Sequence, residues 1–364
     1  MNIKRLAGMT LSTYRFISGR AKKYNDAAES KGRLSMLSDH IRWICREGEF
    51  NDHYFSQGLN ARGTDISEFM GRATLSRFRR KYSGIIMRQI TDGSPGDEGL
   101  FIKDKFYCTA ILREAGFPAP ETLFLIVHGQ LIPLGMAGTV EELPDGEYFL
   151  KNTLVESGYG VSGFTVSNAE VLLADGRPGA LTMRHITAKG RWIIQKRLQS
   201  HNAISRINST ALNTTRIYTL MTLGGIEYLG GYQAFATGTA LTDSWQHGSV
   251  YVGIDPSSNK LRSYGITSQS DSRDGIMYKH PDSGIEFKGY EIPFLTESVE
   301  ICRKAHAFFE SVLIIGWDVA VTDKGPVIVE ANGNPGINVL QCFEGGIRKR
   351  VIDACRQAEK QYHG

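Results

Sequence analysis

A segment near the C-terminus, residues 316–332, places two carboxylates and an amide where they could hold a cation. Asp318, Glu330 and Asn332 occupy two short apolar runs that are separated by a turn. Carboxylate and amide oxygens are the hard ligands that Mg²⁺ prefers, with phosphate oxygens of a substrate completing the shell. The alternative is an exposed polar face of an ordinary antiparallel hairpin.

The register of this hairpin decides whether the three side chains meet. Asp323-Lys324-Gly325 has the composition of a three-residue loop, since Gly325 can adopt a positive φ. If Thr322 pairs with Pro326, then Asp318 lies directly opposite Glu330. Asn332 shares their face because side chains alternate along a strand. The other face, expected in the core, carries Val319, Val321, Val327 and Val329. Opposed carboxylates repel, so holding them on one strand face costs stability.

A glycine-rich stretch follows a lysine at the end of a predicted strand, residues 148–151. The stretch runs from residue 156 to 163, and Gly158, Gly160 and Gly163 form a GxGxxG pattern. Backbone amides in such a loop can approach phosphate oxygens closely. A strand-like segment follows, which excludes a dinucleotide-binding loop, and Lys151 precedes the loop, unlike a protein-kinase lysine. A plain glycine-rich turn remains the alternative.

Two further cationic residues, Lys105 and Arg216, lie in no motif that by itself indicates a function. Lys105 lies in the first turn of a helix predicted over residues 101–115, which Gly116 ends. Arg216 opens a strand predicted over residues 217–221. Taken singly, each is most simply a surface residue.

The elements that must position these residues alternate between helix and strand. Residues 1–90 are predicted to be helical, with Met36, Leu37, Ile41 and Ile44 on one packed face. Strands are predicted at 123–127, 148–151, 164–166, 193–196 and 217–221, and a mixture of strands and long loops over 225–290. A helix is expected over 296–313, strands at 316–322 and 327–332, and a last helix over 346–361. This order predicts an α+β architecture with more than one sheet.

Composition excludes several classes. The chain has 364 residues and a net charge of +4 from 42 basic and 38 acidic residues, too balanced for nucleic-acid binding. A basic cluster at residues 77–81 is interpreted as a solvated helix end. No run approaches the ~18 apolar residues of a membrane helix. The five cysteines form no metal or disulfide pattern, and we expect a reducing, cytoplasmic location.

In order, these motifs resemble the ATP-grasp superfamily. The order is Asp104-Lys105 with its helix, Phe149-Leu-Lys151, the glycine loop, residues 193–198, and Asp318 with Glu330-Ala-Asn332. The branch that looks most similar is that of the sugar-transfer-associated ATP-grasp proteins, through Asn213-Thr-Thr-Arg216, His280-Pro-Asp-Ser-Gly284, Ile315-Gly-Trp-Asp318 and residues 325–332. The resemblance covers roughly residues 98–340. It implies two α+β subdomains that grip ATP.

The resemblance also implies roles and boundaries. Lys105 and Lys151 would contact ATP phosphates beneath the loop Ser157, Gly158, Gly160 and Gly163, and Gln195 with the backbone of Lys196 and Leu198 would read adenine. Asp318, Glu330 and Asn332 would hold one or two Mg²⁺ ions. The implied divisions are a helical region (1–95), a first subdomain with the glycine loop (96–200), a second with the metal hairpin (201–345) and a C-terminal helix (346–364).

Two departures from the superfamily pattern stand out. An acid that would hold the ribose is missing, because residues 199–202 read Gln-Ser-His-Asn. Many relatives carry an arginine two residues before the first metal aspartate, where this chain has Gly316. Arg216 is therefore expected to supply that charge at the reacting centre, with Lys151 as the second catalytic cation.

The function implied is an ATP-dependent carboxylate–amine ligase acting through an acyl phosphate. Its partners would be a small carboxylic acid and an amine, such as an amino acid, a peptide or a sugar-acid derivative. One alternative is a phosphotransferase that uses the same nucleotide site for a hydroxyl acceptor, and another is a non-catalytic nucleotide-binding protein. The acceptor pocket is expected in residues 243–248 or around His280.

Overall fold

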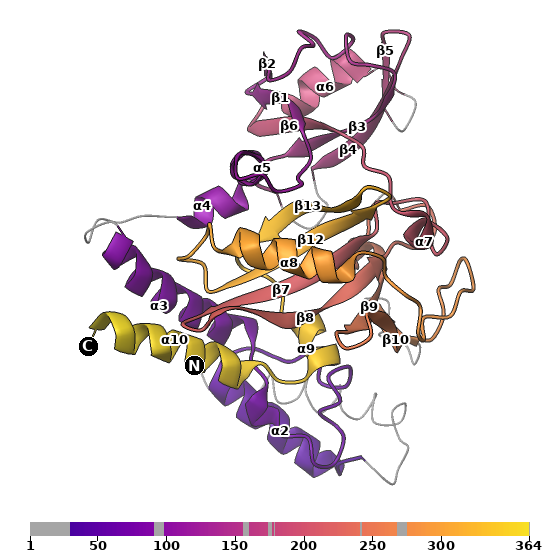
Figure 1. Cartoon of the computed structure of the whole chain (residues 1–364). Helices are drawn as coiled ribbons and strands as arrows, with labels where there is room; N and C mark the ends of the chain where they lie inside the picture. The colour runs from indigo at the N-terminus through magenta and orange to yellow at the C-terminus, as the bar shows by residue number, and fades with distance from the viewer. Residues whose placement is uncertain are drawn as a thin grey trace.

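The computed structural model describes residues 30–90, 98–155, 160–173, 177, 179–240, 242–267 and 275–363. Within these residues the predicted α+β architecture is confirmed, with helices packed around two separate antiparallel sheets (Figure 1). The first sheet has the order β2-β1-β6-β3-β4-β5. Its strands are β1 Thr122–Val127, β2 Gln130–Pro133, β3 Gly146–Asn152, β4 Val161–Ser167, β5 Glu170–Leu173 and β6 Arg191–Lys196.

The second sheet has the order β11-β10-β9-β8-β7-β12-β13. Its strands are β7 Thr214–Thr222, β8 Gly225–Phe235, β9 Val250–Asp255, β10 Lys260–Thr267, β11 Ile276–Met277, β12 Ile314–Thr322 and β13 Gly325–Asn332. The region 225–290 therefore contains strands, as predicted. The hairpin β12–β13 lies at the edge of this sheet and β7 is its inner neighbour.

Helices cover both faces of the second sheet. They are α2 Arg33–Glu47, η1 Ile66–Glu68, α3 Arg72–Ile90, α4 Glu98–Lys103, α5 Lys105–Glu114, α6 Gly179–Thr187, α7 Asn202–Ser205, η2 Trp245–His247, α8 Leu295–His306, α9 Asn338–Glu344 and α10 Arg348–His363. Alternation along β7 sends Ile217 to a core shared with α8 and α5, and Tyr218 to a core shared with α3 and α10. Helix α6 packs on the first sheet. Among the described residues, no helix has the length and apolar character needed to cross a membrane.

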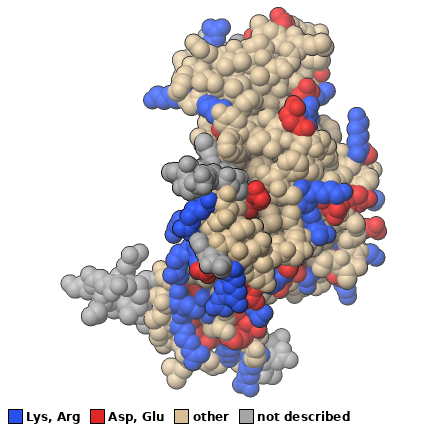
Figure 2. All heavy atoms as spheres, turned by 60° about the vertical axis from the view of Figure 1, so that its left-hand side comes forward, with Lys and Arg blue, Asp and Glu red and all other residues tan. Residues whose placement is uncertain are grey.

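Helices α3 and α10 pack side by side although they lie almost at opposite ends of the chain (Figure 1). The basic cluster at residues 77–81 lies in the middle of α3, not at a helix end as predicted, and Lys81 forms an ion pair with Glu359 of α10 at 2.8 Å. Figure 2 shows Lys and Arg side chains gathered on this side of the molecule. In α2, Met36 and Ile44 are buried as predicted, whereas Ile41 is exposed.

Two predicted helices differ in extent, and one helix was not predicted. The helix expected over 101–115 is interrupted at Asp104, which ends α4 and caps α5. The helix expected over 296–313 ends at His306, and Phe309 and Val312 are buried in the turns beyond it. Helix α9 was not predicted, because its seven residues are too short for a clear apolar repeat.

In the hairpin β12–β13, Asp318 and Glu330 are paired as predicted, but the loop and the register differ from the prediction. The loop contains two residues, not three, since Thr322 pairs with Gly325. A β-bulge at Val329 then restores the offset, and Asp318 lies opposite Glu330 as predicted. The predicted valine face is partly wrong. Ile328 and Ala331 are the buried hydrophobic residues of β13, whereas Val327 is only half-buried and Val329 lines a cleft.

Candidate active site

A cleft of about 470 Å³ lies between the two sheets and beside the helical N-terminal region. The first sheet contributes Lys151 and Gln195, the second sheet Arg216, Asp318, Glu330 and Asn332, and helix α5 Lys105. Seven of the residues predicted from the motifs therefore meet in one place. The cleft is also lined by residues that include His53, Arg72, Thr214, Tyr232, Thr242, Asp243, Ser244, Trp245, Gln246 and Tyr251.

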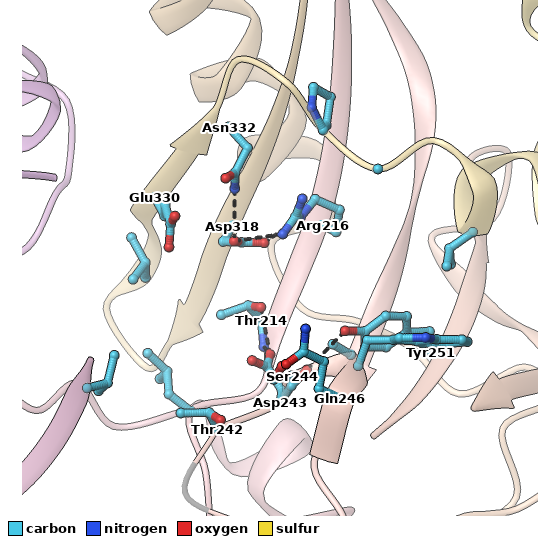
Figure 3. A pocket seen from close by; sticks show the side chains of 18 of the residues that line it. Thr214, Arg216, Thr242, Asp243, Ser244, Gln246, Tyr251, Asp318, Glu330 and Asn332 are labelled. Atoms are coloured by element: carbon cyan, nitrogen blue, oxygen red, sulfur yellow. Dashed lines mark hydrogen bonds and ion pairs between the residues drawn. The ribbon is translucent and has the colours of Figure 1, made fainter. Parts of the chain in front are cut away.

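Arg216 and Asp318 form a bidentate ion pair in the cleft (Figure 3). They are direct partners on β7 and β12, and Arg216 donates from Nε to Oδ1 at 2.5 Å and from Nη2 to Oδ2 at 2.9 Å. A Cβ at Gly316 would lie 3.2 Å from Nη1 of Arg216 and 2.8 Å from Pro335. The guanidinium thus occupies the space above Gly316, and the two bonds to Asp318 use Nε and Nη2 but not Nη1.

Glu330 lies beside this pair and near a second cation. Its Oε1 is 3.5 Å from the Nζ of Lys105, which also donates to the Val155 carbonyl at 2.7 Å. The pKa of Asp318 is raised by burial in the first place and by the charge of Glu330, although Arg216 opposes the rise. Burial and the charge of Glu330 together thus outweigh the opposing effect of Arg216 on the pKa of Asp318.

The chemistry of these donors fits magnesium. Within the described part of the chain no group of three or more His, Cys, Asp or Glu side chains could enclose a metal ion. Asp318, Glu330 and Asn332 offer two carboxylates and one amide, and the Asn332 Nδ2 lies 3.5 Å from Oδ2 of Asp318. Such a partial set suits Mg²⁺, which normally keeps waters and substrate phosphates in its shell, better than an all-protein cage.

Helix α5 owes its position to Asp104. The Asp104 carboxylate accepts from Phe106 N, from Thr153 Oγ1 at 3.0 Å and from Arg191 Nη1 at 3.1 Å. It therefore ties the helix N-terminus to the chain just after β3 and to β6. Lys105, which follows directly, is held at the cleft with its side chain 10% exposed, and is not a free surface lysine.

Lys151 lies at the cleft end of β3 and donates to Oε1 of Gln195 at 3.1 Å. Burial lowers the pKa of Lys151 to about 8, with Lys105 adding to the decrease and Glu330 opposing it. Gln195 is buried, and its Nε2 donates to Thr122 Oγ1 at 3.2 Å. Both ends of the Gln195 side chain are thus occupied, and its proposed role at adenine stays a prediction.

Other predicted nucleotide contacts are not among the residues that line the cleft. Lys196 is exposed and Leu198 half-buried, and neither lines it. Ser157 and Gly158 lie outside the described residues. Gly160 has a φ of 69° and folds back on Asn152, to which its carbonyl is bonded at 2.8 Å.

The predicted glycine loop ends earlier than expected. Strand β4 begins at Val161, three residues before the predicted start, and so includes Gly163 opposite Phe149. Val161 itself lines the cleft. Gly163 is therefore a strand residue and not a loop residue.

The sequence predicted an acceptor pocket in residues 243–248 or around His280, and the structure separates the two. His280 is fully buried, and its Nε2 contacts the Ala236 carbonyl at 2.9 Å. It is not among the lining residues of the cleft. The residues from Asp243 to Gln246, in contrast, form one wall of it.

Asp243 is the residue to which the motifs assigned no role. Its Oδ2 accepts hydrogen bonds from both the backbone N and the Oγ1 of Thr214, each at 2.6 Å (Figure 3). Burial raises the pKa of Asp243 to about 6, the charge of Asp318 adds to the rise, and the Thr214 bonds oppose it. Nothing in the local sequence distinguishes this aspartate, because its partner lies 29 positions away.

These features define a nucleotide-binding class in which two antiparallel α+β units enclose a cleft with paired lysines and paired carboxylates. A family model described as sugar-transfer associated ATP-grasp matches residues 90–356. The chain therefore belongs to this family of the ATP-grasp superfamily, as the sequence motifs indicated. A search of curated proteins found no match.

The solved structures that match this chain include two ligases and a synthetase. D-alanine–D-alanine ligase from Bacillus anthracis has a TM-score of 0.42 and 12% identity over 72% of this chain and 70% of its own. An N5-carboxyaminoimidazole ribonucleotide synthetase in complex with ADP gives 0.39 and 11%, over 65% and 46%. L-amino acid ligase from Bacillus licheniformis gives 0.37 and 9%, over 71% and 47%. The chain thus spans about half the length of two of these proteins, and similarity at this level assigns neither substrate nor reaction.

Proposed function

We propose that this protein is an ATP-dependent carboxylate–amine ligase that forms an amide or peptide bond through an acyl phosphate. The observation that supports it most is the convergence of Lys105, Lys151 and Arg216 on the opposed carboxylates Asp318 and Glu330 in one cleft. This is the charge arrangement that phosphoryl transfer requires, where positioning and neutralisation supply most of the catalysis.

Each residue has a proposed task in the first step. Lys105 and Lys151 bind the phosphates of ATP, and Asp318, Glu330 and Asn332 hold Mg²⁺, which would neutralise charge on those phosphates. A carboxylate oxygen of the acid attacks the γ-phosphorus, and the bond to the ADP oxygen breaks. Arg216 keeps Asp318 oriented through Nε and Nη2 and directs Nη1 to the negative charge that develops.

In the second step an amine displaces phosphate from the acyl phosphate. The N-terminal region contributes His53 and Arg72 to the cleft, so we place the acceptor in the half that this region borders. The predicted domain divisions and the cytoplasmic location belong to the proposal as well. All five cysteines are unpaired, which suits a reducing compartment.

A phosphotransferase remains the second candidate because of one observation. A hydroxyl acceptor needs a base within hydrogen-bond reach, and the motifs identified none. Asp243 is a half-buried carboxylate in the same cleft whose pKa is raised to about 6, which is suitable for that task. The family description, sugar-transfer associated, is compatible with either acceptor.

The fate of the γ-phosphate distinguishes the two. The protein is incubated with ATP, Mg²⁺, hydroxylamine and a panel of amino acids, uronic acids and other small acids. A ligase yields a hydroxamate together with ADP and free phosphate in equal amounts. A stable phosphorylated product, with neither hydroxamate nor free phosphate, would replace the ligase by the phosphotransferase.

A further inference from the structure

Asp243 and the Arg216–Asp318 pair are connected through a single strand. Thr214 and Arg216 are two residues apart on β7, so both side chains point into the cleft, about 7 Å apart along the strand. Asp243 is bonded twice to Thr214 and lies on the same side of β7 as the ion pair (Figure 3). A group bound at Asp243 is therefore close to the reacting centre without overlapping the phosphate lysines.

The carboxylate of Asp243 has no cationic side chain as an ion-pair partner among the described residues. Arg216 is engaged with Asp318. Both Thr214 bonds go to Oδ2, so neither of them occupies Oδ1. A half-buried carboxylate in the cleft with one oxygen outside these bonds is suited to bind a positively charged ligand.

The adjoining wall of the cleft is aromatic. Tyr232 and Tyr251 are stacked with ring centroids 4.8 Å apart, and Trp245 contacts Tyr251 at 5.0 Å. The Tyr251 hydroxyl donates to the backbone carbonyl of Asp243 at 3.3 Å, which fixes this wall to the carboxylate. Aromatic faces attract cations more than neutral hydroxyls, so carboxylate and rings together favour an ammonium ligand.

On the basis of the ligase function proposed above, we propose that Asp243 binds the amine substrate as its ammonium ion and accepts one proton from it. The nitrogen lone pair then forms the C–N bond to the acyl carbon, and the C–O bond to phosphate breaks with its electrons on the leaving phosphate. Of the two protons that the ammonium loses, one goes to Oδ1 of Asp243 and then to solvent, and the other to the departing phosphate. Thr214 positions the carboxylate throughout.

Hydroxylamine and ordinary amines separate this role from the rest of the reaction. Hydroxylamine is uncharged at neutral pH and needs neither an ammonium site nor a base, whereas amino acids, amino sugars and alkylamines are cationic. Asp243→Asn should keep the rate of hydroxamate formation within about threefold of wild type. It should lower amide formation from the cationic amines by ~100-fold or more, the usual contribution of a positioned base. Asp353→Asn, at a half-buried position on α10 that does not line the cleft, should change neither rate.

The other outcomes are decisive as well. Equal rates in Asp243→Asn and wild type with both kinds of amine, or hydroxamate but no amide from any cationic amine in wild type, would overturn the assignment of Asp243. If Asp243→Asn loses both activities, Thr214→Val settles the question, since it keeps the carboxylate but removes one of its two Thr214 bonds. Amide formation should then fall alone, and a joint fall would reject the proposal. Absence of hydroxamate in wild type would instead reject the ligase function.

Discussion

Arg216 holds both oxygens of Asp318 across neighbouring strands, at 2.5 and 2.9 Å, while its third nitrogen lies above Gly316. The guanidinium therefore occupies a position that a side chain at 316 would otherwise fill. One residue can in this way orient a metal-binding carboxylate and still offer donors to the reacting phosphoryl group. The proposed catalytic cation and the proposed metal site therefore share the side chain of Asp318.

Arg216→Ala should affect the reaction more than nucleotide binding. Because Lys105 and Lys151 remain to bind the phosphates, ATP affinity should stay within about threefold of wild type, while the catalytic rate falls by ~100-fold or more, as expected on losing a donor to a developing anion. Calorimetric ATP binding and ADP release measure the two quantities. A parallel loss of affinity and rate would move Arg216 to the nucleotide site.

Glu330→Gln tests the proposed metal site with little change in volume. The substitution removes a ligand charge, so ATP turnover should disappear, while the melting temperature should change little because Glu330 is only half-buried at the cleft. ADP release is measured over a range of magnesium concentrations. Wild-type turnover at saturating magnesium would contradict the assignment.

Lys151→Ala should weaken nucleotide binding, since it removes a half-buried ammonium from the end of β3 in the cleft. Lys324→Ala is the matched control, because Lys324 is exposed in the β12–β13 loop. Binding of a non-hydrolysable ATP analogue should be reduced at least tenfold only in the first variant, about the effect of losing one charge-assisted contact. Equal affinities in both variants would exclude Lys151 from the phosphate site.

The lowered pKa of Lys151 predicts a pH dependence of nucleotide binding. Its ammonium is charged below a pH of about 8 and neutral above it. Affinity for the ATP analogue should therefore be constant at lower pH and decrease as the pH rises through about 8, by up to ~10-fold per unit. Lys151→Arg stays charged and should flatten the profile between pH 7 and 9. An unchanged slope in that variant would assign the titration to another group.

Asp104→Ala tests how Lys105 is positioned. The substitution removes the cap of α5 and leaves Arg191 without its carboxylate partner. It should lower the free energy of unfolding by about 3 kcal/mol, as expected for the loss of a helix cap and a buried ion-pair partner. Urea denaturation measures this loss. Nucleotide affinity should decrease too, because Lys105 follows the cap directly, and full affinity in a destabilised variant would show that Lys105 is positioned independently.

The sequence alone was sufficient to predict features that depend on residues close together in the chain, such as turns, hairpin pairing and helix ends. A turn between two apolar runs was enough to predict that Asp318 faces Glu330, and the helix stop at Gly116 followed from one residue. The order of the motifs indicated the ATP-grasp family, which the family match confirmed. Even here the route differed, since the loop is one residue shorter than predicted and a bulge at Val329 compensates.

The tertiary structure alone decided which distant residues share the cleft. Arg216 meets Asp318 across 102 positions, and Asp243 meets Thr214 across 29. Patterns in a single sequence indicate strand alternation and turns, but they do not predict the order of the strands in a sheet. That order depends on which faces bury the most apolar surface against α3, α8 and α10. Asp243, an ordinary aspartate in the sequence, becomes a chemically distinct carboxylate only because the sheet and the aromatic wall enclose it.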